Sequence, residues 1–207
     1  MKFKNIIFDW SGPIKDVSYS QYWIVKKMFE ELGDSKTTIE EIKKLYEEPY
    51  MKFWAKAFPS LSIESEQELY RKTIHRPDCP EPIAYDDIVG LIKKLKSQDI
   101  KLVVLSSDFK ETVLPEMKKF NLEEIFDEVI TFVHDKSGVI HDIIKRNNFK
   151  QEETAFIGDS NNEMKAGKEA GIITIAVTWG IFNEEKLKLA NPDYLVHNIK
   201  ELEEILL

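Results

Sequence analysis

The chain has 207 residues, of which 43% are apolar and 32% are charged, and its net charge is −8. This length allows one substantial buried core, and the composition is that of a folded globular protein rather than a disordered one. The acidic charge argues against nucleic acid as the main partner, because such a partner needs a basic face. No stretch is apolar for long enough to cross a bilayer, and the single cysteine, Cys79, excludes an internal disulfide and favours a reducing, cytoplasmic location.

The first predicted element is a strand over Ile6–Phe8 that delivers a carboxylate, Asp9, to its end. Consecutive large apolar residues indicate a strand buried on both faces, as in a parallel sheet, and Gly12 and Pro13 then end it. An aspartate in this place is often only a turn or helix-capping residue. The carboxyl end of a buried parallel strand is, however, also where open α/β sheets bind their ligands.

From about Val17 to His75 the sequence has helical periodicity and no convincing strand. Thr37 or Thr38 with Glu41 forms a capping box, and Pro49 ends the helix that it starts. We therefore predict an all-helical cap domain, residues 16–83, inserted into a core domain made of residues 1–15 and 84–207. The expected helices are Ser20–Leu32, a second one from Thr37 or Thr38 through Leu45, Tyr50–Phe58 and Ser62–Ile74. An aromatic cluster is expected to form mostly the core of this insert: Tyr50, Phe53, Trp54 and Phe58.

From Asp86 onward helices and strands alternate, which indicates βαβ units. The fold class is therefore α/β, with a doubly wound parallel sheet in the core domain. Pro115 should lie near the first turn of its helix or kink it. Expected strands are Ile100–Leu105, Glu128–Val133, Thr154–Ile157, Ile172–Val177 and Tyr194–Val196. Expected helices lie around Ile88–Leu95, Val113–Phe120 and Ile140–Ile144, and over Asn183–Ala190 and Ile199–Leu206.

Polar groups follow the predicted strands of the core: Asp9, Ser106, Lys136 from the loop after its strand, and Asp159. A carboxylate can attack phosphorus and form an aspartyl-phosphate, which divides one difficult hydrolysis into two easier steps. Because a carboxylate and a phosphate repel each other, such a site needs a cation, and paired strand-end carboxylates suit Mg²⁺. A hydroxyl and an ammonium would then hold the transferring oxygens.

The segment from Asp9 to Asp16, DWSGPIKD, resembles the first motif of the haloacid dehalogenase-like superfamily, D-x-D-G-T-L-x-D. Three further motifs follow in the family's order, and the segments 166–171 and 177–180 are similar to phosphoglycolate-phosphatase-like members. The resemblance implies a nucleophile at Asp9, a hydroxyl at Ser106 with Ser107 beside it, and a phosphate-binding lysine at Lys136. It also implies a metal site made by Asp9, the main-chain carbonyl of Ser11, and Asp159, with Ser160 and Glu163 in support.

The sequence departs from the family pattern at Ser11, where phosphatases carry a second aspartate that serves as acid and base. A serine hydroxyl cannot do this work near neutral pH, and its loss should slow turnover by roughly 10²–10⁴-fold. Replacing Ser11 by Asp should therefore raise the turnover of simple phosphomonoesters. Pro13 also replaces the usual Thr or Val, and Glu163 replaces the final Asp of the fourth motif.

Three functions remain open on the sequence alone. The first is a Mg²⁺-dependent phosphatase for a small phosphorylated metabolite, which would be slow or would act on substrates with activated leaving groups. Arg76 is its candidate anion contact from the cap. The second is dehalogenase-like or phosphonoacetaldehyde hydrolase-like chemistry, the latter with a Schiff-base lysine at Lys52 or Lys56. The third is a module that binds a phosphorylated ligand without turnover. The substrate and the choice between monomer and homodimer stay open.

Overall fold

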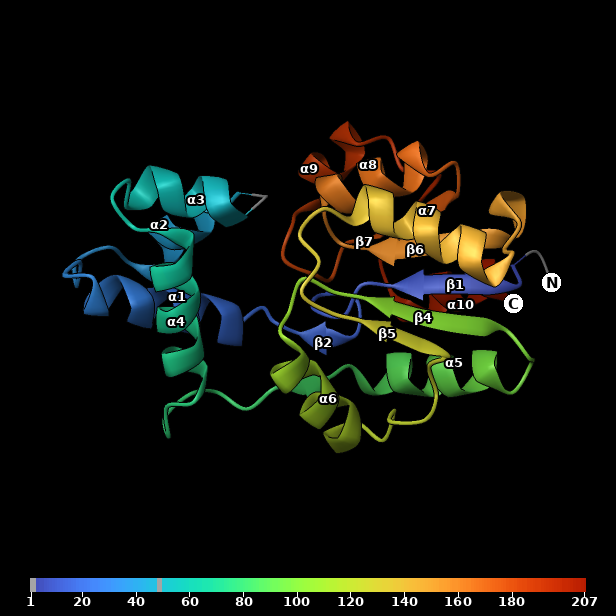
Figure 1. The fold of residues 1–207 in the computed structure, drawn as a ribbon, viewed down its shortest axis with the longest axis horizontal. Helices are drawn as coiled ribbons and strands as arrows, with labels where there is room; N and C mark the ends of the chain where they lie inside the picture. The colour runs from blue at the N-terminus through green and yellow to red at the C-terminus, as the bar shows by residue number, and fades with distance from the viewer. Residues whose placement is uncertain (1–2, 48–49) are drawn as a thin grey trace. The chain divides into compact units, whose positions relative to one another are not determined.

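The computed structural model describes residues 3–47 and 50–207, and the chain divides into two compact units (Figure 1). The core unit comprises Met1–Asp16 and Ile83–Leu207, and the helical unit comprises Val17–Pro82. Pro49, which was expected to end a helix, lies outside the described residues.

A six-stranded parallel sheet forms the middle of the core unit, in the order β5-β4-β1-β6-β7-β8. The order is that of a doubly wound α/β fold, as the sequence predicts. Strand β1 lies between β4 and β6, and Ile7 is in register with Val103 on one side and Phe156 on the other. The strands are β1 Asn5–Phe8, β4 Lys101–Leu105, β5 Glu128–Ile130, β6 Thr154–Gly158, β7 Ile173–Val177 and β8 Tyr194–Val196.

Helices cover both faces of this sheet, so its central strands are buried on both sides and read as continuous apolar runs. One face packs against α5, α6 and α10 through residues such as Leu91, Val113 and Leu202. The other packs against α7 and α8 through Ile140, Ile143 and Ala166 (Figure 1). The helices of this unit are α5 Asp86–Lys96, α6 Lys110–Lys119, α7 Lys136–Asn147, α8 Asn161–Glu169, α9 Glu184–Leu189 and α10 Ile199–Leu206, with a 3₁₀ turn at Gln151–Glu153.

The end of β5 and the start of α7 differ from the expectation. Strand β5 ends at Ile130 rather than Val133, because Phe132 has a left-handed backbone (φ 60°) that a strand cannot continue through. Lys136 is consequently the first residue of α7, capped by Asp135, rather than a loop residue. Pro115 lies in the interior of α6, beyond its first turn.

The helical unit contains only helices within its described residues: α1 Ser20–Glu31, α2 Ile39–Leu45, α3 Tyr50–Ala57 and α4 Ile63–Ile74. Thr38 and Glu41 form the expected capping box, and Ser62 caps α4. The ring of Phe29 packs against Phe53, Trp54 and Phe58 with ring-centre distances of 6.0, 5.6 and 4.8 Å. Phe53 and Trp54 are buried, so this aromatic cluster packs as the sequence predicts.

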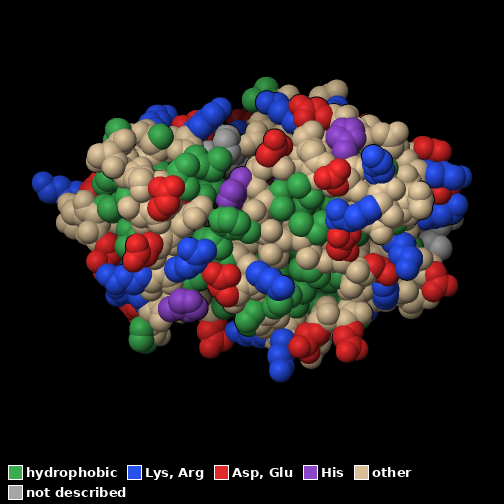
Figure 2. Space-filling model, viewed as in Figure 1, with side chains coloured by type: hydrophobic (Ala, Val, Ile, Leu, Met, Phe, Trp, Pro, Cys, Tyr) green, Lys and Arg blue, Asp and Glu red, His purple; other side chains and the backbone are tan. Residues whose placement is uncertain are grey.

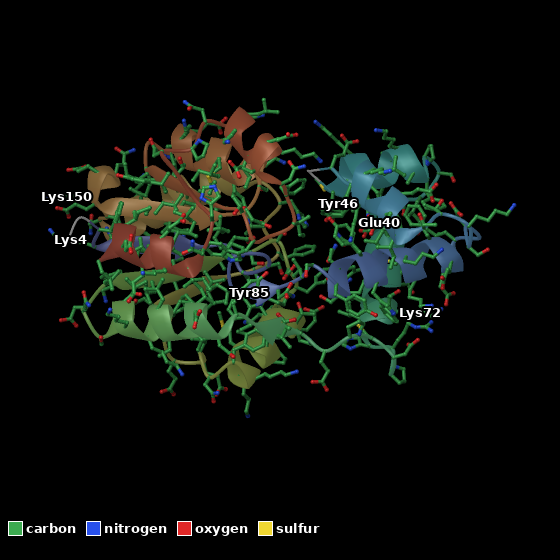
Figure 3. All side chains as sticks on the ribbon, turned by 180° about the vertical axis from the view of Figure 1, so that it is seen from behind. Lys4, Glu40, Tyr46, Lys72, Tyr85 and Lys150 are labelled. Atoms are coloured by element: carbon green, nitrogen blue, oxygen red, sulfur yellow. The ribbon has the colours of Figure 1, made fainter. Side chains whose placement is uncertain are left out.

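Short antiparallel strands join the two passages of chain between the units, and the sequence did not predict them. In β2 (Lys15–Asp16) and β3 (Ile83–Ala84), Lys15 is in register with Ala84 and Asp16 with Ile83. Tyr85, labelled in Figure 3, comes directly after β3 and is the N-cap residue of α5, but its side chain makes no capping hydrogen bond. Its hydroxyl group instead donates a hydrogen bond to the carbonyl oxygen of Trp179 at 3.0 Å. The ladder therefore brings both ends of the insert to one place on the core.

Acidic and basic side chains are interspersed across the face shown in Figure 2. Lys4 and Lys150, which Figure 3 shows at one end of the core unit, both pair with Glu153, at 2.9 and 3.6 Å. None of the helices in the described ranges has both the length and the apolar character needed to span a membrane.

Candidate active site

Three adjacent strands present polar side chains at their carboxyl ends. Asp9 follows β1, Ser106 follows β4, and Asp159 follows β6, and all three side chains are buried. Because parallel strands all end at the same edge, these residues lie at one edge of the sheet, in the place where α/β folds bind ligands.

Lys136 extends from the first turn of α7 to this edge and bonds to two carboxylates. Its Nζ atom donates to Asp9 Oδ1 at 2.7 Å and to Glu163 Oε1. All three side chains are under 10% exposed, so water screens this ion pair network little. The network fixes the Asp9 carboxylate through one oxygen, Oδ1, which leaves the second oxygen for other work.

Glu163 is held in this network by the start of its own helix. Its Oε2 atom accepts hydrogen bonds from the backbone N–H groups of Asp159 and Ser160, at 3.0 and 3.2 Å. Ser160 returns the interaction as the cap of α8, because its Oγ atom accepts from the Glu163 backbone N–H at 3.3 Å. This capping box uses the extra methylene of glutamate to reach Lys136 with one oxygen while capping the helix with the other.

The Asp159 carboxylate fits into a space that admits no further side-chain atoms. A Cβ atom on Gly12 would lie 2.3 Å from Asp159 Oδ2, and one on Gly180 would lie 2.0 Å from it. Gly12 also has a positive φ of 102°, which a glycine adopts without strain. The backbone N–H of Ile181 donates to Asp159 Oδ2 at 2.6 Å. The two glycines thus explain why the turns after β1 and β7 can close around this carboxylate.

Asp9, Asp159 and Glu163 offer ligand oxygens that lie within 4.8 Å of one another. When all three carboxylates are ionised, the single positive charge of Lys136 leaves the group with a formal charge of −2. Burial, together with the charge of Glu163, raises the pKa of Asp9 well above its usual value, although Lys136 opposes this and Asp159 adds to it. Burial lowers the pKa of Lys136, but Asp9 and Glu163 outweigh it and raise that pKa overall.

The donor set therefore fits a divalent metal ion. It consists of buried carboxylate oxygens, which are the ligands of hard cations, and its excess charge is the one that such an ion would neutralise. Asn161 is the first residue of α8, shortly after Asp159. Its buried side-chain oxygen, Oδ1, has no hydrogen-bond partner among the described residues. The acidic triad can thus hold a metal ion, because Lys136 balances only one of its three negative charges.

Ser11 is held by a residue that the sequence did not single out. The Ser11 hydroxyl donates to Asp108 Oδ2 at 2.5 Å, and Lys15 Nζ lies 3.3 Å from the same oxygen. Burial favours a neutral Asp108, but Lys15 and the Ser11 hydroxyl outweigh it and lower the pKa of Asp108 below its usual value. Asp108 is therefore a carboxyl group of lowered pKa directly beside Ser11.

Lys15 and Trp10 anchor the other side of this arrangement on α6. Glu116 accepts from Trp10 Nε1 at 2.6 Å through one oxygen and from Lys15 Nζ at 3.1 Å through the other. Trp10 is fully buried and stacks on Phe120 with 5.7 Å between ring centres. The first motif is thus tied to the helix after β4 by hydrogen bonds and by ring packing.

The remaining candidate residues lie elsewhere. Ser107 is exposed next to buried Ser106. Arg76 belongs to the helical unit, where its guanidinium pairs with Asp78 at 3.0 Å and with Glu31 at 3.5 Å. Lys52 and Lys56, the candidates for a Schiff base, are both exposed. Neither has the buried surroundings that make a lysine amine nucleophilic.

Named proteins similar in sequence to this chain include two phosphatases. Pyrophosphatase PpaX of Halalkalibacterium halodurans is 29% identical over 160 residues, which is 72% of this chain and 73% of the relative. Phosphoglycolate phosphatase of Synechococcus elongatus is 25% identical over 128 residues, 60% of each chain.

Solved structures show the same fold over the whole chain. A haloacid dehalogenase-like family hydrolase from Streptococcus pneumoniae superposes with a TM-score of 0.83 and 24% identity, covering 100% of this chain and 99% of the other. A protein described as a predicted phosphatase, from Clostridium acetobutylicum, gives a TM-score of 0.86 and 21% identity with the same coverage.

The sequence profile of the haloacid dehalogenase-like hydrolases matches residues 6–177, which span the first strand, the insert and all the strand-end groups described above. A carboxylate bonded to a buried lysine, an acidic triad and a strand-end serine all lie within this matched range. The chain therefore belongs to the haloacid dehalogenase-like hydrolase family.

Proposed function

We propose that this protein is a Mg²⁺-dependent phosphatase that acts on a small phosphorylated metabolite through an aspartyl-phosphate on Asp9. The observation that carries the proposal is the contact of Asp9 Oδ1 with buried Lys136, beside Asp159 and Glu163. Lys136 orients the nucleophile and offsets its charge, so the attack is assigned to the other oxygen, Oδ2. A Mg²⁺ ion on Asp9, Asp159 and the Ser11 carbonyl would supply the positive charge that lets carboxylate and phosphate approach.

Ser106 is the group assigned to the transferring phosphoryl oxygens. It follows β4, next to β1, and is 1% exposed. A buried hydroxyl at this edge can donate to an oxygen that gains charge in the transition state. The helical unit, Val17–Pro82, is proposed to act as the cap that selects substrates, since it is a separate compact unit inserted directly after the first motif.

The presence of Ser11 in place of an acid favours particular substrates. A leaving group that departs as a stable anion needs no proton, so acyl phosphates and phosphoanhydrides avoid the step for which this site has no acid. Alkyl phosphomonoesters need that proton. We therefore expect acetyl phosphate and pyrophosphate to be turned over faster than a simple alkyl phosphate, by at least roughly 10²-fold.

Trapping of the covalent intermediate tests the proposal. Wild-type protein with Mg²⁺ and radiolabelled acetyl phosphate should acquire acid-stable label, and Asp9→Asn should acquire none and show no turnover. Asp127→Asn is the matched control, because Asp127 is also paired with lysines, Lys96 and Lys101, but on the surface. Turnover that survives in Asp9→Asn would overturn the proposal. Release of halide from a haloacid, or of an aldehyde from a phosphonate, would assign the protein to another reaction of the same family.

A further inference from the structure

Asp108 contacts both serines at the edge of the sheet, and it does so with opposite hydrogen-bond polarity. Its backbone N–H donates to Ser106 Oγ at 3.0 Å, and its carboxylate accepts the hydroxyl hydrogen of Ser11 at 2.5 Å. Each hydroxyl has one hydrogen and two lone pairs. Ser106 therefore keeps its hydrogen available for another group, whereas Ser11 has given its hydrogen to Asp108 and has lone pairs left.

The position of Asp108 is fixed from several directions, so the two polarities are built into the fold. Its backbone carbonyl accepts from the N–H of Phe132, at 2.8 Å, in the loop after β5. Its carboxylate is paired with Lys15, which is in turn paired with Glu116 on α6. Lys15 offers only donors, so it cannot turn the Ser11 hydroxyl around. Lys15 Nζ donates to Asp108 Oδ2, the same oxygen that accepts from Ser11, at 3.3 Å, so this oxygen accepts from both groups.

These polarities match the two halves of the reaction proposed above. In the first half, Asp9 attacks phosphorus and the bond from phosphorus to the leaving oxygen breaks, with its electron pair departing on the leaving group. Phosphoryl oxygens need hydrogen-bond donors in this step, and Ser106 is one. In the second half, a water oxygen attacks phosphorus, the bond to Asp9 breaks and its electron pair returns to the carboxylate. Both hydrogens of the water leave on the released phosphate.

The second half needs an acceptor for the hydrogen of the attacking water, because that hydrogen bond turns a lone pair of the water toward phosphorus. Resting on the proposed function, we propose that Asp108 is a positioning residue that makes Ser11 this acceptor. The pair substitutes for the missing aspartate only in orienting water, and it provides no proton for a leaving group. The site would accordingly hydrolyse its phosphoenzyme efficiently while depending on substrates whose leaving groups need no acid.

The test measures formation and decay of the phosphoenzyme separately, with radiolabelled acetyl phosphate and Mg²⁺ followed by an unlabelled chase. Ser11→Ala removes the acceptor. Asp108→Asn keeps the size of the side chain, but its amide can donate to Ser11 and reverse the hydroxyl. Both variants should slow decay roughly 10- to 100-fold and change formation by less than about 3-fold, since the Asp108 backbone still donates to Ser106. The double variant should decay no more slowly than Ser11→Ala.

Each other outcome is informative. Equal slowing of formation and decay in Asp108→Asn would show a merely structural role and overturn the inference, as would decay at the wild-type rate in that variant. Asp127→Asn, folded as judged by circular dichroism, should behave like wild type in both steps. If wild-type protein forms no phosphoenzyme with Mg²⁺, the proposed function fails and the role of Asp108 fails with it. If a phosphoenzyme forms and its decay rate is the same in wild type, Ser11→Ala and Asp108→Asn, only the role of Asp108 is overturned.

Discussion

Lys136 bonds to two of the three buried carboxylates that cluster at the strand ends, and its removal should be costly for folding. In Lys136→Met the side chain keeps a similar length but the contacts with Asp9 and Glu163 lose their positive partner. Removing one member of a buried ion pair costs about 3–5 kcal/mol, because a charge stays buried without compensation. In a protein of this size each kcal/mol shifts the melting temperature by about 2–4 °C, so a fall of about 6–20 °C is expected.

Urea unfolding followed by circular dichroism, with and without Mg²⁺, measures the loss in the free energy of unfolding. A matched double variant, Lys136→Met with Glu163→Gln, removes one negative charge together with the positive one. The glutamine oxygen can still accept from the backbone of Asp159 and Ser160, so the cap of α8 is kept. The double variant should recover at least about half of the lost stability. A single variant within about 1 kcal/mol of wild type, or a double variant no more stable than the single one, would refute the reasoning.

Three further predictions follow from other contacts. Ser11→Asp alone would place a second carboxylate against Asp108, and two such charges about 4 Å apart repel each other by about 4 kcal/mol. The double variant, Ser11→Asp with Asp108→Asn, removes this repulsion and should hydrolyse an alkyl phosphate faster than the single variant. Burial raises the pKa of Glu66 from 4.5 to about 7, so stability should fall as pH rises through this range; Glu66→Gln should melt higher than wild type at pH 8 and like wild type below pH 4.5. Gly180→Ala would bring a Cβ atom against the Asp159 carboxylate and should weaken Mg²⁺ binding, measured by calorimetry, by at least about 10-fold.

Controls separate these effects from general damage. For Glu66→Gln, the gain in the free energy of unfolding over wild type at pH 8 is at most about 3 kcal/mol, and solvent screening reduces it. A gain that stays the same at all pH values would contradict the raised pKa of Glu66. For the glycine, Gly138→Ala is the matched change, because a Cβ atom there meets nothing within 4 Å. Equal metal affinity in Gly180→Ala and Gly138→Ala would refute the steric argument. A single Ser11→Asp variant at least as active as the double one would refute the charge argument.

Much of the core could be predicted because its signals are local. The apolar runs before Asp9 and Asp159 are buried on both faces, so a reader of the sequence sees uninterrupted strands that end in carboxylates. The end of β5 was harder to predict, because Val133 is as apolar as the strand before it and only the left-handed backbone of Phe132 stops the ladder. Lys136 was therefore expected in a loop, whereas it begins a helix.

The contacts of Ser11 could not be predicted in the same way. Its partner Asp108 is 97 positions away along the chain, and the pairing depends on how two strand-end loops approach each other. One signal was available: Lys15 directly follows the apolar pair Pro13-Ile14, and a lysine that is buried there needs a counter-ion. The sequence does not say which acid provides it. The partner of Lys15 becomes evident only when β1 and β4 lie side by side.

The paired strands β2 and β3 make the insert topologically independent of the sheet. Because Asp16 faces Ile83 across this ladder, the chain returns to the core at the point where it left. The entropy of closing a loop grows only slowly with its length, and here hydrogen bonds already hold the loop's two ends together. Insertions and deletions within residues 17–82 can therefore change the size of the helical unit without altering the register of β1. A lineage could exchange the whole insert and inherit Asp9, Lys136 and Asp159 in the same frame.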